Sequence, residues 1–187
     1  MTESTAVLLV DEPVAGVRRF TLHRPQRRNA LNAELVEALL TGFDDVQKSR
    51  DVRCLVLAAA GDGPFCAGGD LGGMSNDDGF LAQHRKRGRF ADLLVAIEHC
   101  RIPVVAAVAG AALGGGFGLM LACDLVAVAE DVQLGVPEVK RGLFPMTIAR
   151  LLDAHLPRKR LAELALLGGT VDGKTAEAWH IVNRAVP

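Results

Sequence analysis

The amino-acid sequence predicts an α/β fold, because a helix pattern and a strand pattern alternate along it. Between residues 29 and 48, apolar side chains recur at spacings of four and three, as on the buried face of an amphipathic helix. They are Leu31, Leu35, Leu39, Phe43 and Val46. The stretch RCLVLAAA, residues 53–60, is short and almost wholly apolar, which is typical of a strand buried on both faces of a parallel sheet.

The same alternation continues along the chain. Two strands, 6–10 and 16–22, flank a turn ahead of the first helix. Downstream, the pattern predicts helices at about 80–100, from the triple glycine to about 123, and at 145–155, 157–167 and 173–179. It also predicts strands at 104–110, 124–129, 132–135 and the end of the chain.

The composition favours one domain over residues 1–187, with a small-molecule partner. A chain of 187 residues that is 50% hydrophobic can bury one substantial core. The net charge of −1 provides no broad electropositive surface, so we expect no nucleic acid. Basic clusters at 84–89 and 158–160 have no interleaved aromatic residues, and each fits a solvated helix face, an anionic ligand or a partner subunit.

The cysteines and the start of the chain bear on the compartment. None of the four cysteines forms a CxxC pair, which favours buried free thiols in a reducing compartment over disulfides or a metal site. The opening MTESTAVLLVDEP has no basic residue, unlike a signal peptide, and no stretch reaches the roughly 18 apolar residues of a membrane span. We therefore expect a cytoplasmic protein without a membrane partner.

Several common catalytic devices are missing from the sequence. The three serines form no GxSxG motif, so a hydrolase with a serine nucleophile elbow is not indicated. The five histidines never take HExxH or another close ligand spacing, so no metal is expected. The glycines spell neither GxGxxG nor a phosphate loop that ends in GK[ST].

Two glycine-rich turns remain, each after a predicted buried strand. They are GDGPFCAGGDLGGM, residues 61–74, and AALGGGFGLMLACD, residues 111–124. Glycine lets the backbone approach a ligand closely, and the first amides of a helix have no partner inside the helix. Two such amides that converge on one oxygen form an oxyanion hole. The alternative for either turn is a tight packing point between a helix and a strand.

With these turns, the chain resembles the enoyl-CoA hydratase/isomerase, or crotonase, superfamily. The resemblance lies in HRPQRRNALNAELVEAL (23–39), FCAGGDL (65–71), AALGGGFGLMLACDLVAVAE (111–130) and LGVPEVKRGLFP (134–145). It implies a spiral of ββα units that acts on an acyl thioester of coenzyme A, with no cofactor besides the CoA of the substrate. Family members usually continue into C-terminal helices after such a strand, whereas this sequence stops at Pro187, so we expect the domain without these helices. A homo-oligomer, trimer or hexamer, is expected if those helices are present or dispensable.

The resemblance also implies roles for particular residues. Gly69 and Gly115 match the two amide donors of the oxyanion hole. Cys66, Gly68, Asp70 and Leu71 belong to the stretch that binds CoA, with backbone near Cys66 and Gly68 at the adenine end, and Arg27 or Arg28 lies where the family approaches the CoA phosphates.

The resemblance matches only one of the two hydratase acids. Glu138 in GVPE matches one acid, and the position of the other is Gly118. Hydration by two carboxylates needs both groups, so we expect isomerase-like chemistry with Glu138 as the single acid and base. The alternatives are a solvent-exposed turn residue at Glu138 and a non-catalytic acyl-CoA-binding or assembly subunit. If a carboxylate were introduced at position 118, we expect Phe117 to compete for its space.

Overall fold

The computed structural model describes residues 6–70 and 80–187, with the side chains of all of these except residues 80–87. Six strands form the main sheet in the order β1-β2-β3-β4-β6-β9. They are β1 (Leu8–Val14), β2 (Val17–Leu22), β3 (Cys54–Ala59), β4 (Val104–Val108), β6 (Leu125–Ala129) and β9 (Arg184–Val186). Strand β1 pairs antiparallel with β2, and the other neighbours pair parallel, which confirms the parallel arrangement expected from the apolar strands.

A second, smaller sheet stands beside the first. Its strands are β5 (Ala112–Leu113), β7 (Leu134–Gly135) and β8 (Thr170–Val171), in the order β5-β7-β8. Strand β7 was expected within 132–135, whereas β5 and β8 were not predicted. Each of these two has only two residues, which is too short for an alternation of apolar and polar residues to show.

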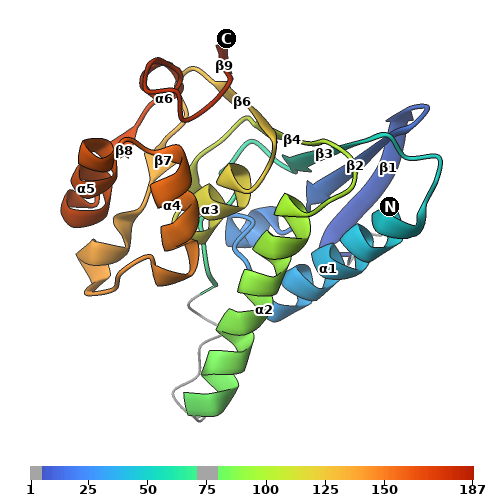
Figure 1. Cartoon of the computed structure of the whole chain (residues 1–187), viewed down its shortest axis with the longest axis horizontal. Helices are drawn as coiled ribbons and strands as arrows, with labels where there is room; N and C mark the ends of the chain where they lie inside the picture. Colours follow the sequence, from blue (N-terminus) through green and yellow to red (C-terminus); the bar gives the residue numbers. More distant parts are fainter. Residues whose placement is uncertain (1–5, 71–79) are drawn as a thin grey trace.

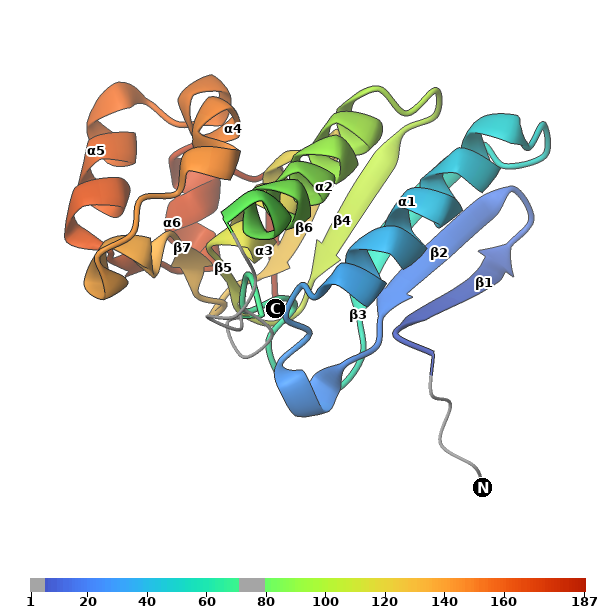
Figure 2. The same cartoon turned by 90° about the horizontal axis from the view of Figure 1, so that it is seen from below.

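The helices lie close to their predicted positions. They are α1 (Ala33–Lys48), α2 (Phe80–Glu98), α3 (Gly115–Leu121), α4 (Ala149–His155), α5 (Arg158–Leu167) and α6 (Gly173–Ala178). Figure 2 shows α1 and α2 side by side along the main sheet. Helices α4 and α5 gather at the opposite end of the molecule from β1 and β2 (Figure 1). Three short 3-10 helices, η1 (Pro25–Arg27), η3 (Pro137–Arg141) and η4 (Met146–Ile148), complete the elements that matter for the site.

Helix α1 is fixed at its start and along its apolar face. The side chain of Asn32 accepts a hydrogen bond from the Leu35 N–H at 3.0 Å, which satisfies one of the free donors of the first turn. All five apolar residues of the predicted stripe are buried. Phe43 meets Phe20 of β2 edge to face, with ring centroids 5.6 Å apart, so this helix packs directly on the sheet.

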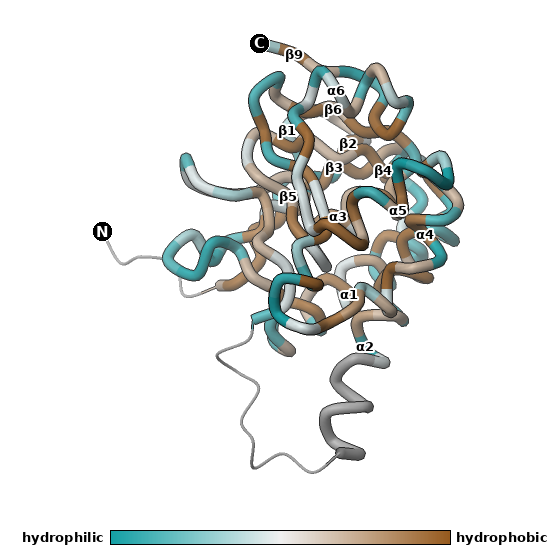
Figure 3. The backbone as a smooth tube through the Cα atoms, turned by 90° about the vertical axis from the view of Figure 1, so that its left-hand side faces the viewer, coloured by the Kyte–Doolittle hydropathy of each residue, from teal (hydrophilic) through white to brown (hydrophobic). Residues whose placement is uncertain are grey.

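Helix α3 lies inside the protein. Every residue from Gly116 to Leu121 is buried, so the helix has no solvent face, and its tube is brown, the hydrophobic colour, in Figure 3. A short helix that is apolar on all sides is held by its surroundings. The start of α3 is therefore a rigid position for a functional site.

The structure bears on two expectations from the sequence, the state of the cysteines and the absence of a membrane span. All four cysteines are free thiols; Cys66 and Cys123 are buried, while Cys54 and Cys100 are half-buried. Among the described helices, none has the length and apolar character that crossing a membrane requires.

Candidate active site

The two glycine-rich turns predicted from the sequence pack backbone to backbone. The Cys66 N–H donates to the Ala111 carbonyl at 3.1 Å, and the Leu113 N–H donates to the Cys66 carbonyl at 3.0 Å. A Cβ atom built on Gly116 would lie only 2.2 Å from the Cys66 carbonyl oxygen. Only glycine fits there, so part of the glycine pattern serves the close packing that we considered as the alternative.

The same contact brings Gly68 and Gly69 beside the start of α3. Gly68, with φ +93°, and Gly114, with φ +54°, adopt backbone angles that favour glycine. A Cβ on Gly68 would lie 3.4 Å from the amide nitrogen of Gly115. Residues 68–69 and 114–115 are therefore close neighbours, although 46 positions separate them in the chain.

The amides of Gly69 and Gly115 lack backbone acceptors within the described part of the chain. Gly115 is the first residue of α3, where an N–H has no partner inside the helix. Gly69 pairs with Leu31 through its neighbours, because the Leu31 N–H donates to the Gly68 carbonyl and the Asp70 N–H donates to the Leu31 carbonyl. Both predicted donors thus remain available for an acceptor outside the backbone.

Glu138 places a carboxylate against the second turn. It stands in the first turn of η3, and a Cβ on Gly114 would lie 2.7 Å from its Oε1 and 3.6 Å from its Oε2. The Gly114 N–H donates to the Gly135 carbonyl at 2.9 Å, which ties the GVPE turn to the glycine turn. Glu138 is half-buried and packs on Gly114, so it is not the fully solvent-exposed turn residue considered from the sequence.

The environment of Glu138 favours its neutral form. Its Oε2 is buried and has no hydrogen-bond partner among the described residues. Burial raises the pKa of this carboxyl above its usual value, because the charged form loses its hydration. A carboxyl whose pKa is moved toward neutrality can both accept and return a proton.

The surroundings of Gly115 and Gly118 are apolar. A Cβ on Gly115 would lie 3.4 Å from Leu31 Cδ1 and 3.5 Å from the ring of Phe90, a residue of α2. A Cβ on Gly118 would lie 2.2 Å from Ile148 Cγ2. Ile148, and not the expected Phe117, therefore occupies the space that a side chain at position 118 would need. Successive helix residues point about 100° apart around the helix axis, and the Phe117 side chain packs in the core instead.

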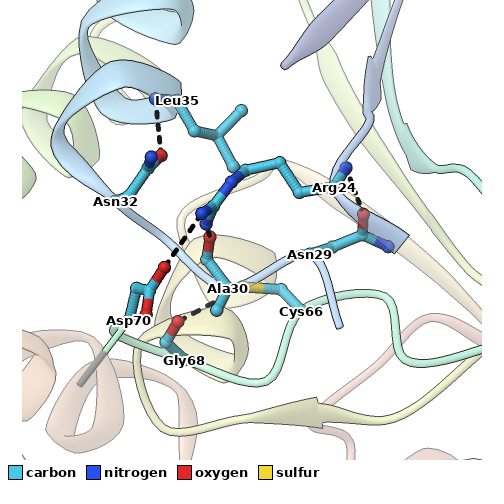
Figure 4. Close-up of polar contacts among 8 residues, drawn as sticks. All are labelled: Arg24, Asn29, Ala30, Asn32, Leu35, Cys66, Gly68 and Asp70. Atoms are coloured by element: carbon cyan, nitrogen blue, oxygen red, sulfur yellow. Dashed lines mark hydrogen bonds and ion pairs between the residues drawn. The ribbon is translucent and has the colours of Figure 1, made fainter. Parts of the chain in front are cut away.

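A buried ion pair that the sequence analysis missed holds the loop around Gly69 (Figure 4). The guanidinium group of Arg24 bonds the Asp70 carboxylate at 2.9 Å and donates to the Ala30 carbonyl, and the two side chains are only 11% and 16% exposed. Asn29 accepts from the Arg24 N–H and donates to the Ala60 and Pro64 carbonyls. The segment 24–31 is thereby joined to the loop that carries Gly69. Arg24 belongs to the HRPQRRNAL motif, and this motif was the sequence feature that could have pointed to the ion pair.

The residues that the resemblance assigns to CoA are partly engaged within the protein. The N–H and the carbonyl of Cys66 form hydrogen bonds with the glycine-rich turn that precedes α3. Burial raises the pKa of the Cys66 thiol to about 12. The Gly68 carbonyl accepts from Leu31, and Asp70 pairs with Arg24. Leu71 lies outside the described residues.

The two candidate phosphate ligands lie at the end of η1. Arg27 and Arg28 are exposed, and the Arg28 carbonyl accepts a hydrogen bond from the Ala67 N–H at 3.1 Å. The structure thus brings Arg28 beside the loop that contains Cys66 and Gly68. In the described part of the chain, no three His, Cys, Asp or Glu side chains gather as metal ligands would.

The fold and the paired turns define an α/β protein of the crotonase type, and comparisons with known proteins agree. The family described as "Enoyl-CoA hydratase/isomerase" matches residues 12–187. A crystal structure of enoyl-CoA hydratase from Mycobacterium smegmatis superimposes with a TM-score of 0.92 at 34% identity, covering 96% of this chain and 70% of that one. The chain belongs to the enoyl-CoA hydratase/isomerase family.

Two curated relatives share the same level of sequence identity with this chain. "Enoyl-CoA hydratase domain-containing protein 2, mitochondrial" of Bos taurus is 36% identical over 182 residues, or 93% of this chain. A relative from Thermus thermophilus is 36% identical over 171 residues, or 89% of this chain. The chain spans 59% of the bovine and 66% of the Thermus relative's length.

Proposed function

We propose that this protein binds an acyl-CoA thioester and shifts a proton along its acyl chain through an enolate, with Glu138 as the single acid and base. The observation that carries this proposal is the Glu138 carboxylate packed on Gly114, one residue from the available amide of Gly115. A proton carrier and an anion-stabilising donor thus adjoin each other. The family membership supports a CoA thioester as the substrate class.

The amides of Gly69 and Gly115 would hold the thioester carbonyl oxygen. When a base removes the proton next to a thioester, negative charge moves onto this oxygen in the transition state. Two backbone donors fixed by packing stabilise that charge without having to reorganise. The buried position of α3 and the ion pair of Arg24 with Asp70 support such fixed geometry.

Glu138 would then move the proton without a second carboxylate. In the shift of a 3-enoyl to a 2-enoyl thioester, its carboxylate removes a proton from C2. The carboxyl then returns the proton to C4, where the C3=C4 electron pair forms the new C4–H bond. The C1=C2 pair of the enolate moves to C2–C3 as the oxygen gives back its charge and the C=O bond re-forms. No atom is gained or lost, so one group with a raised pKa suffices.

The remaining contacts of the substrate follow the family resemblance. We propose that the backbone near Cys66 and Gly68 and the side chains of Arg27 or Arg28 face the CoA portion, with no separate cofactor. We also propose a homo-oligomer, because Leu143, Phe144 and Met146 expose apolar side chains that association would cover. Light scattering tests this part.

The experiment that tests the function is incubation with short and medium 2-enoyl- and 3-enoyl-CoA thioesters, followed by product analysis. Conversion of 3-enoyl to 2-enoyl thioesters without 3-hydroxyacyl-CoA is the expected result. Tight binding of acyl-CoA without turnover would instead support the binding-subunit alternative. Absence of both binding and turnover would contradict the proposal.

A further inference from the structure

One side of the start of α3 carries both Glu138 and Ile148. The Gly118 N–H donates to the Gly114 carbonyl at 3.0 Å, so these two glycines are one helical turn apart. The Glu138 carboxylate lies against Gly114, and the Ile148 side chain lies against Gly118. An aliphatic side chain therefore occupies the position one turn beyond the carboxylate.

Ile148 cannot clear this position by rotating its side chain. A Cβ on Gly118 would lie 2.2 Å from Ile148 Cγ2 and 2.9 Å from Ile148 Cβ, and Cβ does not move with the rotamer. The residue is 2% exposed and ends η4, which packs against both α2 and α3. Any side chain at position 118 would require a shift of the η4 backbone, and removal of Ile148 Cγ2 would leave the milder contact with Ile148 Cβ at 2.9 Å.

We infer that Ile148 selects the reaction at this site: it fills the space into which an acid at position 118 would project, so that the site moves protons and does not add water. This inference rests on the proposed function. Hydration places a hydroxyl group on C3 and a proton on C2 of a 2-enoyl thioester. It needs a second group to activate the water while the first delivers the proton.

A set of four variants tests the inference: Gly118→Glu, Ile148→Ala, the double variant Gly118→Glu/Ile148→Ala, and the matched control Gly118→Gln/Ile148→Ala. The control has the same volume as the double variant but cannot accept a proton. Each protein is given a 2-enoyl-CoA in ¹⁸O-labelled water, and labelled 3-hydroxyacyl-CoA is measured by mass spectrometry. The parent protein is also assayed for the double-bond shift.

The double variant should form 3-hydroxyacyl-CoA about 10²-fold faster than its glutamine control, as expected for a positioned acid or base. Gly118→Glu alone should form none, because Ile148 remains in place. Equal hydration by Gly118→Glu alone and by the double variant would overturn the inference, as would equal rates for the double variant and its control. A parent protein that shifts no double bond and binds no acyl-CoA would instead contradict the proposed function.

The packing part of the inference is tested without turnover, which also covers a double variant that fails to fold. Gly118→Ala should lower the melting temperature of the parent protein, because the new methyl group meets Ile148 Cγ2. In the Ile148→Ala background the same change should lower it less, because the contact with Cγ2 at 2.2 Å is gone and the contact with Cβ at 2.9 Å remains. Equal decreases in both backgrounds would show that Ile148 does not fill this space, and the inference would fall.

Discussion

Replacement of Glu138 by glutamine is the most direct test of the site. The amide has nearly the volume of the carboxylate, so the contact with Gly114 can be kept. It cannot accept a proton at neutral pH. If Glu138 is the only acid and base, turnover of a 3-enoyl-CoA should fall by about 10²- to 10⁴-fold. This corresponds to a barrier increase of about 3–5 kcal/mol.

The same substitution should have the opposite effect on stability. Burial raises the pKa of Glu138 in the folded protein, so the folded state holds this proton more tightly than the unfolded chain does. The contribution of Glu138 to stability is therefore fully present below the unfolded pKa of about 4.3 and is lost as the pH rises through the raised folded pKa. The melting temperature of Glu138→Gln relative to the parent should accordingly increase with pH above about 4.3.

The assay combines three measurements on Glu138→Gln and a control. The rate of double-bond shift, the affinity for an acyl-CoA by calorimetry and the melting temperature from pH 4 to 8 are compared with those of Glu163→Gln. Glu163 is an exposed residue of α5 that pairs with Arg160 and is not one of the proposed site residues. Retention of the parental rate in Glu138→Gln would refute the role of Glu138. A relative melting temperature that does not change with pH would refute the raised pKa that burial gives this carboxyl.

Three further outcomes follow from the structure. Acyl-CoA should bind more tightly than free CoA in calorimetry, because the amides of Gly69 and Gly115 need a carbonyl oxygen; equal affinities would count against an oxyanion hole. Gly116→Ala should destabilise the fold by about 1–3 kcal/mol in denaturant unfolding, because its Cβ would meet the Cys66 carbonyl at 2.2 Å, and an unchanged midpoint would be inconsistent with that contact. Arg24→Met should cost about 3 kcal/mol by leaving Asp70 buried without this partner, and Arg24→Met combined with Asp70→Asn should recover part of the loss if the ion pair matters.

The sequence predicted most helices and strands because their signals are local. The stripe of apolar residues in α1 and the apolar stretch of β3 depend on neighbours within a few positions, and both elements formed as expected. Glu138 also came from a local signal, the GVPE motif, and its role stays a prediction. Strands β5 and β8 were missed because two residues carry no periodicity.

The contacts among distant segments were decided only by the tertiary structure. Ile148 faces Gly118 and Arg24 bonds Asp70 although 30 and 46 residues separate them. No rule based on residue spacing predicts that such distant residues are in contact. The Cys66 thiol illustrates the same limit, since its raised pKa comes from burial that the chain acquires on folding.

The sequence by itself indicated the family, the two glycine turns and, through the resemblance, Glu138 as the single acid that we propose. Only the tertiary structure shows what surrounds Gly118. A glycine at position 118 could have left space for water, and only the packing of η4 against α3 shows an isoleucine in its place. The physical reason is that local sequence sets backbone conformation, whereas the volume around a residue is set by side chains from segments far away in the chain.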